Sequence, residues 1–319
     1  MQKKLIALAV AAAFSAPAFA DTTVYGIADL AIANVSGGGG TNLISGGLST
    51  SRFGVKHTEG LDNGMTAVVV LEYALDVANK TALGSNSAGA VNARQQMLAL
   101  AGDFGTVAAG FLQTAGYDFS VKYDPTAGSA VDTAAYVNTT AVSSYINSSG
   151  RAAHAAAYIS PDLNGLKIAV NRSFDATNAT APAPKLAVNL LSVNYSAGPL
   201  SVGGAYAADD AASKTTEYGL GASYALKEIS LFGTYNSSKT GAGNSKTAMA
   251  FHAVAPVASL GTVVFTYGQN NLTAKNSGFT LALLKDLSKT TTGYGAIEKK
   301  SVSGGTDTTI LAVGLRKKF

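Results

Sequence analysis

The sequence predicts an all-β fold, a transmembrane antiparallel β-barrel of sixteen strands. Three observations lead to this prediction: apolar residues that alternate with a period of two, segments longer than ordinary strands, and connections that are short and long in turn. No segment after residue 20 shows a sustained helical period or a run of 18 apolar residues, so membrane-spanning helices are not expected.

The alternation is clearest in residues 217–226, EYGLGASYAL. Every second residue from Tyr218 to Leu226 is apolar, whereas the residues between them are small or polar. The same spacing recurs in three further segments, 51–58, 66–76 and 308–319. Because a soluble β-sandwich shows this alternation as well, the length of the segments has to decide between the two folds.

The segments are about nine to twelve residues long, which is near the length that a tilted strand needs to span hydrocarbon. Sixteen are expected, at 23–35, 51–59, 65–76, 94–102, 105–112, 151–160, 166–174, 186–196, 200–208, 216–226, 228–238, 246–255, 261–270, 277–286, 290–299 and 308–319. Short turns rich in Gly, Asp, Asn and Pro alternate with longer links such as 77–93 and 175–185. Short turns at one end and long loops at the other are typical of outer-membrane barrels.

A closed barrel also accounts for the polar face of each strand. Every backbone N–H and C=O group in a bilayer must be paired, which a sheet without free edges achieves. A barrel of this size encloses water, so its inner face needs no hydrophobic partner.

The first twenty residues predict a signal peptide that is cleaved. Lys3 and Lys4 precede an apolar run, and small residues precede Asp21. Residues 21–319 contain no linker or charge block and are expected to form one barrel domain. Without Lys3 and Lys4, about 21 of the 23 basic residues face 19 acidic ones, which is too balanced a charge for a nucleic-acid binder.

The composition also limits the chemistry. The chain has no cysteine, so disulfides, thiol catalysis and cysteine-bound zinc are excluded. The three histidines, His57, His154 and His252, are scattered without metal-ligand spacing, and no Gly-x-Ser-x-Gly motif is present. No cofactor, no metal and no enzymatic activity are therefore expected.

One connection departs from the pattern of the others. Residues 113–150 include the stretch GYDFSVKYDPTAGSAVDTAAYVNTT, which shows no periodicity. Structureless connections of this length are rare in compact domains. A hollow barrel has room for such a segment in its lumen, so this connection is the part of the chain most closely tied to function.

Six segments, taken in order, form a series that spans the chain after its first twenty residues. They are 22–35 (TTVYGIADLAIANV), 51–73 (SRFGVKHTEGLDNGMTAVVVLEY), 102–118 (GDFGTVAAGFLQTAGYD), 195–206 (YSAGPLSVGGAY), 283–295 (LLKDLSKTTTGYG) and 313–319 (VGLRKKF). In their order and spacing they resemble the general porins of Gram-negative outer membranes, particularly the neisserial and betaproteobacterial type.

The resemblance implies a homotrimer in the outer membrane of a Gram-negative bacterium, through which small hydrophilic solutes and ions diffuse passively. It implies contact with outer-membrane lipid and lipopolysaccharide, and a third outer loop, here 113–150, that folds into the barrel as a constriction. The terminal Phe319, with Leu315, Val313 and Leu311 on its side of the strand, is similar to the signal that the barrel-assembly machinery reads.

In that family, carboxylates of the third loop face arginines on the barrel wall. Arg52 of SRFGVK matches the first of these arginines, and Arg151 stands before the next strand, where another is usual. The third is absent, because residues 110–113 read GFLQ. Lys56 shares the face of Arg52 and Arg94 opens the fourth strand, so these four residues are expected to form a basic wall.

Three acidic residues of the loop are expected to face this wall: Asp118, Asp124 and Asp132. The Pro-Glu-Phe-Gly-Gly segment that the family has in this loop is absent from the sequence. Opposed charges at a narrow point create a transverse field that orients dipolar solutes. Four bases against three acids predict a weak preference for anions, whereas dominance of the loop acids, or of Glu72 and Asp76, would give cation preference. The structural alternatives are a solvated charge in a wide lumen for Arg52 and Lys56 and a turn residue for each of the three acids.

Some alternatives stay open. Arg172 falls on the apolar phase of LKIAVNRSF, so it lies near a membrane rim, lies in a subunit contact, or marks a slip in strand register. Tyr and Phe near strand ends are expected to form interface girdles. The functional alternatives are a barrel that acts mainly as an adhesin or structural surface protein, a substrate-specific channel, and a barrel enzyme.

Overall fold

The structure is a computed structural model that describes residues 20–79, 92–139, 142–148, 150–176 and 185–319. Apart from Ala20, the predicted signal peptide, residues 1–20, lies outside the described residues. Parts of the long links 77–93 and 175–185 also lie outside them.

Almost all of the described chain forms β-strands. They are β1 (Asp21–Val35), β2 (Gly40–Ser45), β3 (Arg52–Gly60), β4 (Thr66–Ala74), β5 (Ala93–Gly102), β6 (Gly105–Gln113), β7 (Arg151–Ile159), β8 (Leu166–Ser173), β9 (Val188–Ala197), β10 (Leu200–Asp209), β11 (Thr215–Leu226), β12 (Ile229–Thr240), β13 (Lys246–Val257), β14 (Gly261–Asn270), β15 (Asn276–Asp286), β16 (Thr291–Val302) and β17 (Thr308–Lys318). The helical elements are η2 (Asp62–Gly64), α1 (Ala115–Tyr123), α2 (Thr133–Val137) and the π-helical turn η3 (Ser144–Ser148). None of the helices in the described part of the chain is long and apolar enough to cross a membrane.

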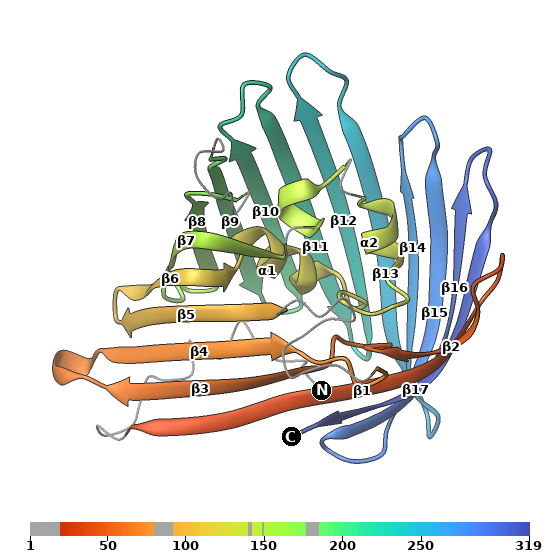
Figure 1. Cartoon of the computed structure of the whole chain (residues 1–319), viewed down its shortest axis with the longest axis horizontal. Coiled ribbons are helices and arrows are strands. Elements are labelled where there is room, and N and C mark those ends of the chain that lie inside the picture. The colour runs from red at the N-terminus through yellow and green to blue at the C-terminus, as the bar shows by residue number, and fades with distance from the viewer. Residues whose placement is uncertain (1–19, 80–91, 140–141, 149, 177–184) are drawn as a thin grey trace.

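The strands form one antiparallel sheet that closes on itself (Figure 1). Each strand from β3 onward pairs with the next, and β17 pairs with β1. β2 and β3 lie end to end along β1, because β2 pairs with its residues 30–35 and β3 with its residues 21–27. The two share one position in the ring, so the predicted barrel of sixteen positions is confirmed. Strand β2 was not predicted, because residues 40–45 fall between two of the expected strands, 23–35 and 51–59.

The short turns lie at one end of the barrel. The turn between β7 and β8 places Asn164 and Gly165 at positive φ, 58° and 89°. A Cβ at Gly165 would collide with the carbonyl oxygen of Ser196, so glycine is required there. The long links lie at the opposite end, which in outer-membrane barrels faces the cell exterior.

Alternation along the strands separates an apolar outer face from a polar inner face. On the outside, Leu98 of β5 is 61% exposed and Leu220 of β11 is 60% exposed. On the inside, Glu72, Glu217 and Glu298 are buried. This arrangement suits a barrel whose outer surface meets hydrocarbon and whose inner surface meets water.

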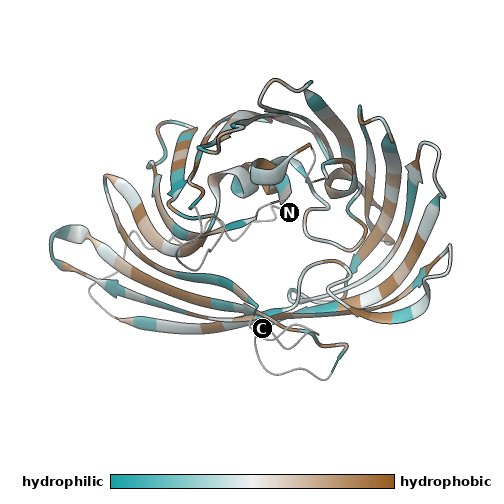
Figure 2. Cartoon of the chain, turned by 45° about the horizontal axis from the view of Figure 1, so that its top comes forward, coloured by the Kyte–Doolittle hydropathy of each residue, from teal (hydrophilic) through white to brown (hydrophobic). Residues whose placement is uncertain are grey.

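The connection 113–150 lies inside the barrel, as Figure 2 shows. Phe119 and Tyr123 of α1 pack against Leu190 and other apolar residues of β9 and β10, and α2 contacts β13 to β16. Val131 packs against alanines of β1 and β17. The loop therefore crosses the lumen from the β9 side to the β1 side, which confirms that it folds inward.

Candidate functional site

A group of arginines on the inner wall surrounds one buried carboxylate. Nε of Arg94 on β5 donates to Oε1 of Glu72 on β4 at 2.7 Å, and Nε of Arg52 on β3 lies 4.0 Å from Oε2. The hydroxyl of Tyr25 donates to Oε2 at 3.1 Å. Glu72 is only 1% exposed, so its charge offsets part of the charge of the two guanidinium groups.

Arg151, the first residue of β7, connects this group to the loop. Its guanidinium lies within electrostatic range of the other two arginines, and its Cζ is 5.4 Å from the centroid of the Tyr117 ring. Its Nη2 donates to Oε1 of Gln113 at 3.4 Å, and Nε2 of Gln113 donates to Oδ1 of Asp118. Gln113 ends β6, in the segment 110–113 that lacks the third arginine, and it joins the wall to the loop without adding a charge.

Asp118 lies on α1 and is half-buried. Burial raises the pKa of its carboxyl group to about 6, although the hydrogen bond from Gln113 and the charge of Arg151 oppose this shift. Of the three predicted loop acids, Asp118 is the one that the contacts of the described residues connect to the arginines.

Asp124 and Asp132 lie against the opposite wall, where both are buried and hydrogen-bonded to each other. Asp132 caps α2 by accepting from the backbone N–H of Ala135 at 2.8 Å, and Asp124 accepts from the hydroxyl of Thr126 at 2.7 Å. Nδ1 of His252 on β13 lies 3.6 Å from Oδ1 of Asp124. Burial and the neighbouring carboxylate raise the pKa of Asp132 to about 8, so the pair holds a proton near neutral pH.

Further carboxylates of the wall hold the returning part of the loop. Glu217 on β11 accepts from the backbone N–H groups of residues 144–146 at 2.6, 3.0 and 3.1 Å. The hydroxyl of Tyr145 donates to Oδ2 of Asp209 at 2.6 Å. Because the N–H groups of a single helical turn lack partners within it, these carboxylates fix the position of η3.

Lys56 shares the inner face of β3 with Arg52 but is four residues away along the strand. It interacts electrostatically with Asp21.

Two bases outside the predicted set extend the wall. Lys318 of β17 interacts electrostatically with Arg316 and Arg52, and Arg316 donates to the hydroxyl of Ser49 at 3.4 Å. The sequence signal for both was the alternation in 308–319, which puts them opposite the apolar residues. Glu72 was placed on the polar face in the same way, but its partners are residues of other strands that no local pattern identifies.

The C-terminal residues lie on the outer face. Leu311, Val313, Leu315 and Phe319 are exposed. The backbone of Phe319 exchanges two hydrogen bonds with Gly26, at 3.0 and 3.1 Å, and so extends the seam between β17 and β1.

The arrangement places cations on one side of the lumen and the docked loop on the other. Bases project from β3, β5, β7 and β17, whereas the two helices of the loop, α1 and α2, contact β8 to β16. Opposed charges across a passage create a transverse field, which orients dipolar solutes. Within the described ranges, no group of three or more His, Asp or Glu residues could hold a metal ion.

The model of the Gram-negative porin family matches residues 7–305. The chain is similar to outer membrane porin protein 32 of Delftia acidovorans, with 29% identity over 314 residues that cover 92% of this chain and 88% of the relative. Among solved structures it is similar to an anion-selective porin from Comamonas acidovorans, with 25% identity, a TM-score of 0.79, and coverage of 94% of this chain and 100% of the other. The trimer form of OmpT from Vibrio cholerae shares the fold, with 13% identity, a TM-score of 0.72, and coverage of 94% and 99%.

The family match spans most of the chain, and the closed barrel with its inward loop agrees with it. This chain therefore belongs to the Gram-negative porin family and is a channel for diffusion across the outer membrane.

Proposed function

We propose that this porin prefers anions weakly and that loop 113–150 narrows its passage against the basic wall. The observation that carries the proposal is the group of Arg52, Arg94 and Arg151, which has one buried carboxylate, Glu72, among three cations. A net positive wall raises the local concentration of anions. The similarity to a porin described as anion-selective supports the same assignment.

In this proposal, the predicted site residues have different roles. The three arginines line the narrowing together with Arg316 and Lys318, and Lys56 adds charge further along the wall. Asp118 faces the passage. Asp124 and Asp132 hold the loop against β13.

Planar-bilayer recording tests the proposal. Purified protein is expected to give large, ohmic conductance steps, and the reversal potential in a KCl gradient is expected to have the sign of anion preference. The double variant Arg94→Gln and Arg151→Gln is expected to lose that preference. Clear cation preference in the unmodified channel would contradict the proposed role of the wall.

We further infer a homotrimer whose copies meet at the aliphatic part of the outer face. The exposed aromatic side chains within described strands lie on β7, β9 and β11 to β14: Tyr158, Tyr195, Tyr218, Tyr224, Tyr235, Phe251, Phe265 and Tyr267. On β1, β2, β4 to β6, β15 and β17 the exposed large residues of the described strands are aliphatic. Aromatic residues suit the membrane interface, so the arc whose described strands expose none suits contact between copies.

We infer two further partners, lipopolysaccharide in the outer leaflet and the barrel-assembly machinery. The machinery is inferred to recognise Phe319 together with Leu311, Val313 and Leu315 on the same face of β17.

We also infer that the protein has no catalytic activity. Purified protein is expected to show no esterase or peptidase turnover. Turnover that is lost when His57, His154 or His252 is changed would contradict this.

A further inference from the structure

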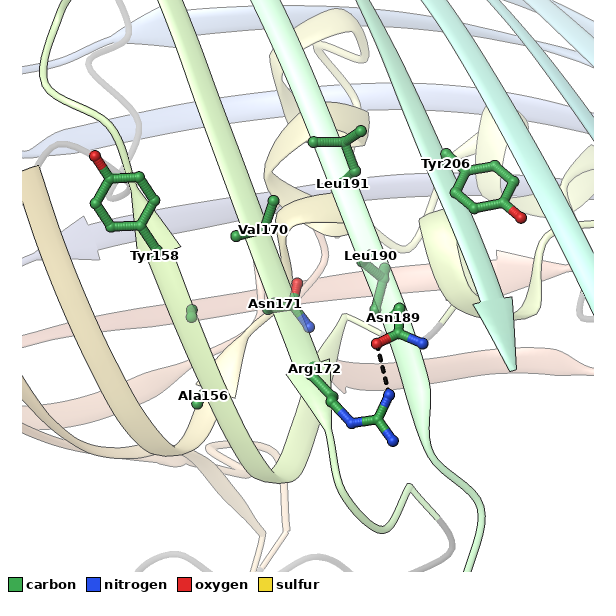
Figure 3. A pocket seen from close by; sticks show the side chains of 10 residues that line it. Ala156, Tyr158, Val170, Asn171, Arg172, Asn189, Leu190, Leu191 and Tyr206 are labelled. Atoms are coloured by element: carbon green, nitrogen blue, oxygen red, sulfur yellow. Dashed lines mark hydrogen bonds between the residues drawn. The ribbon is translucent and has the colours of Figure 1, made fainter. Parts of the chain in front are cut away.

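A groove of about 550 Å³ lies on the outer face of β7 to β10 (Figure 3). Its apolar lining includes Ala156, Tyr158, Val170, Leu191 and Tyr206. At one end, Nη1 of Arg172 donates to Oδ1 of Asn189 at 2.8 Å. A groove of this volume is in the usual range for ligand sites, which combine a mostly apolar lining with a few polar groups.

The strand register places Arg172 at the outer-leaflet end of this groove. Arg172 lies opposite Ala156 of β7 and Asn189 of β9, in a ladder without a register shift on either side. It is two residues, about 7 Å, further than Val170 toward the long link between β8 and β9. Of the alternatives for this arginine, the unbroken ladder rules out a slip in register.

The charge of Arg172 has no acidic partner among the described ion pairs. Its guanidinium is exposed and lies over the ring of Phe174, with 5.8 Å from Cζ to the centroid. The link that follows β8 contains one acid, the buried Asp175, and the exposed base Lys185. Asp210, at the end of β10, accepts from the backbone N–H of Ala187. The groove therefore ends in an exposed positive charge.

We propose that this groove binds a phosphorylated lipid of the outer leaflet, with the phosphate at Arg172 and Asn189 and an acyl chain along the apolar lining. The proposal rests on the lipopolysaccharide partner proposed above and gives it a site. An anionic headgroup complements the exposed guanidinium, and Arg is well suited to phosphate. The groove lies on the arc that exposes tyrosines, which favours lipid over a second copy of the chain.

Native mass spectrometry of the full-length purified porin tests this site, with lipid A and dephosphorylated lipid A as the probes. Arg172→Gln is expected to weaken the binding of lipid A by at least about tenfold, because a charge-assisted hydrogen bond is lost. Lys239→Gln is the matched control, since Lys239 is also an exposed base at the long-link end of a strand. Leu191→Trp fills the groove without removing the charge and is expected to weaken both probes.

The proposal is overturned if Arg172→Gln and Lys239→Gln bind lipid A equally well, or if dephosphorylated lipid A binds unmodified protein as tightly as lipid A does. A change in oligomeric state in Arg172→Gln would assign the groove to a second copy instead. Bilayer conductance of the same preparations keeps the channel function separate, because the Arg172 variant is expected to conduct normally. If the protein conducts normally but binds neither lipid A nor dephosphorylated lipid A, the lipid site is wrong and the channel function still stands.

Discussion

Glu72 determines the charge balance of the arginine group. Glu72→Gln keeps an acceptor for Arg94 and Tyr25 but removes the negative charge. Two unit charges 4 Å apart interact by about 4 kcal/mol at an effective dielectric constant of 20, so one charge matters here. We expect the anion-to-cation permeability ratio, measured from reversal potentials, to rise severalfold. Glu59→Gln, an exposed acid on β3, is the control, and equal ratios in the two variants would contradict the assignment.

Asp118 gives this preference a dependence on pH. Its pKa of about 6 is above that of an ordinary aspartate, so the folded protein holds its proton more tightly than the unfolded chain does. The stability that this proton contributes is present below about pH 4 and is lost as the pH rises to about 6.

The titration of Asp118 is also expected to change the ion selectivity of the channel. At pH 7.5 Asp118 is ionised and offsets the wall, whereas at pH 5 it is mostly protonated, so anion preference is expected to increase as the pH falls. Asp118→Asn is expected to show the higher preference at both pH values. If that variant keeps the full pH step in its reversal potential, another group is responsible.

Among the elements, helix α1 can pack against the wall because the strand beneath it, β11, has a glycine at the point of contact. A Cβ at Gly221 of β11 would occupy the place of the Tyr123 ring. Gly221→Val is therefore expected to displace α1 from the wall at a cost of about 1–3 kcal/mol, which is typical of overpacking, and to give larger and noisier single-channel currents. At Gly233 of β12 a Cβ would meet no atom within 4 Å, so Gly233→Val is the control. Equal conductance in the two variants would show that α1 does not narrow the passage.

The strands could be predicted because their pattern is local. The alternation in 217–226 puts Glu217 and Gly221 on the inner face, which the structure confirms. What each of them contacts could not be predicted, since residues 144–146 and Tyr123 are brought to β11 by the fold of a loop without periodicity. The separation of Asp118 from Asp124 has the same cause, because it depends on which wall α1 packs against.

At the scale of the whole molecule, two leucines with equal exposure test where the copies meet. Leu98 on the aliphatic arc and Leu220 on the aromatic arc are 61% and 60% exposed. Tryptophan is tolerated by lipid at either place, but it would overfill a packed subunit contact. We expect Leu98→Trp to lower the temperature at which the trimer dissociates, as followed by native gel electrophoresis, and Leu220→Trp to leave it unchanged. Equal behaviour of the two variants would place the contact elsewhere.

The position of the inward loop also constrains the order of folding. The helices α1 and α2 of this loop precede in the chain the strands that they contact, since α1 packs on β8 to β12 and α2 on β13 to β16. Contacts between segments so distant in sequence form late, because a long stretch of chain must be ordered first. The proposed constriction is therefore completed only when the last third of the polypeptide has joined the barrel, and a chain that stops before then is expected to lack it.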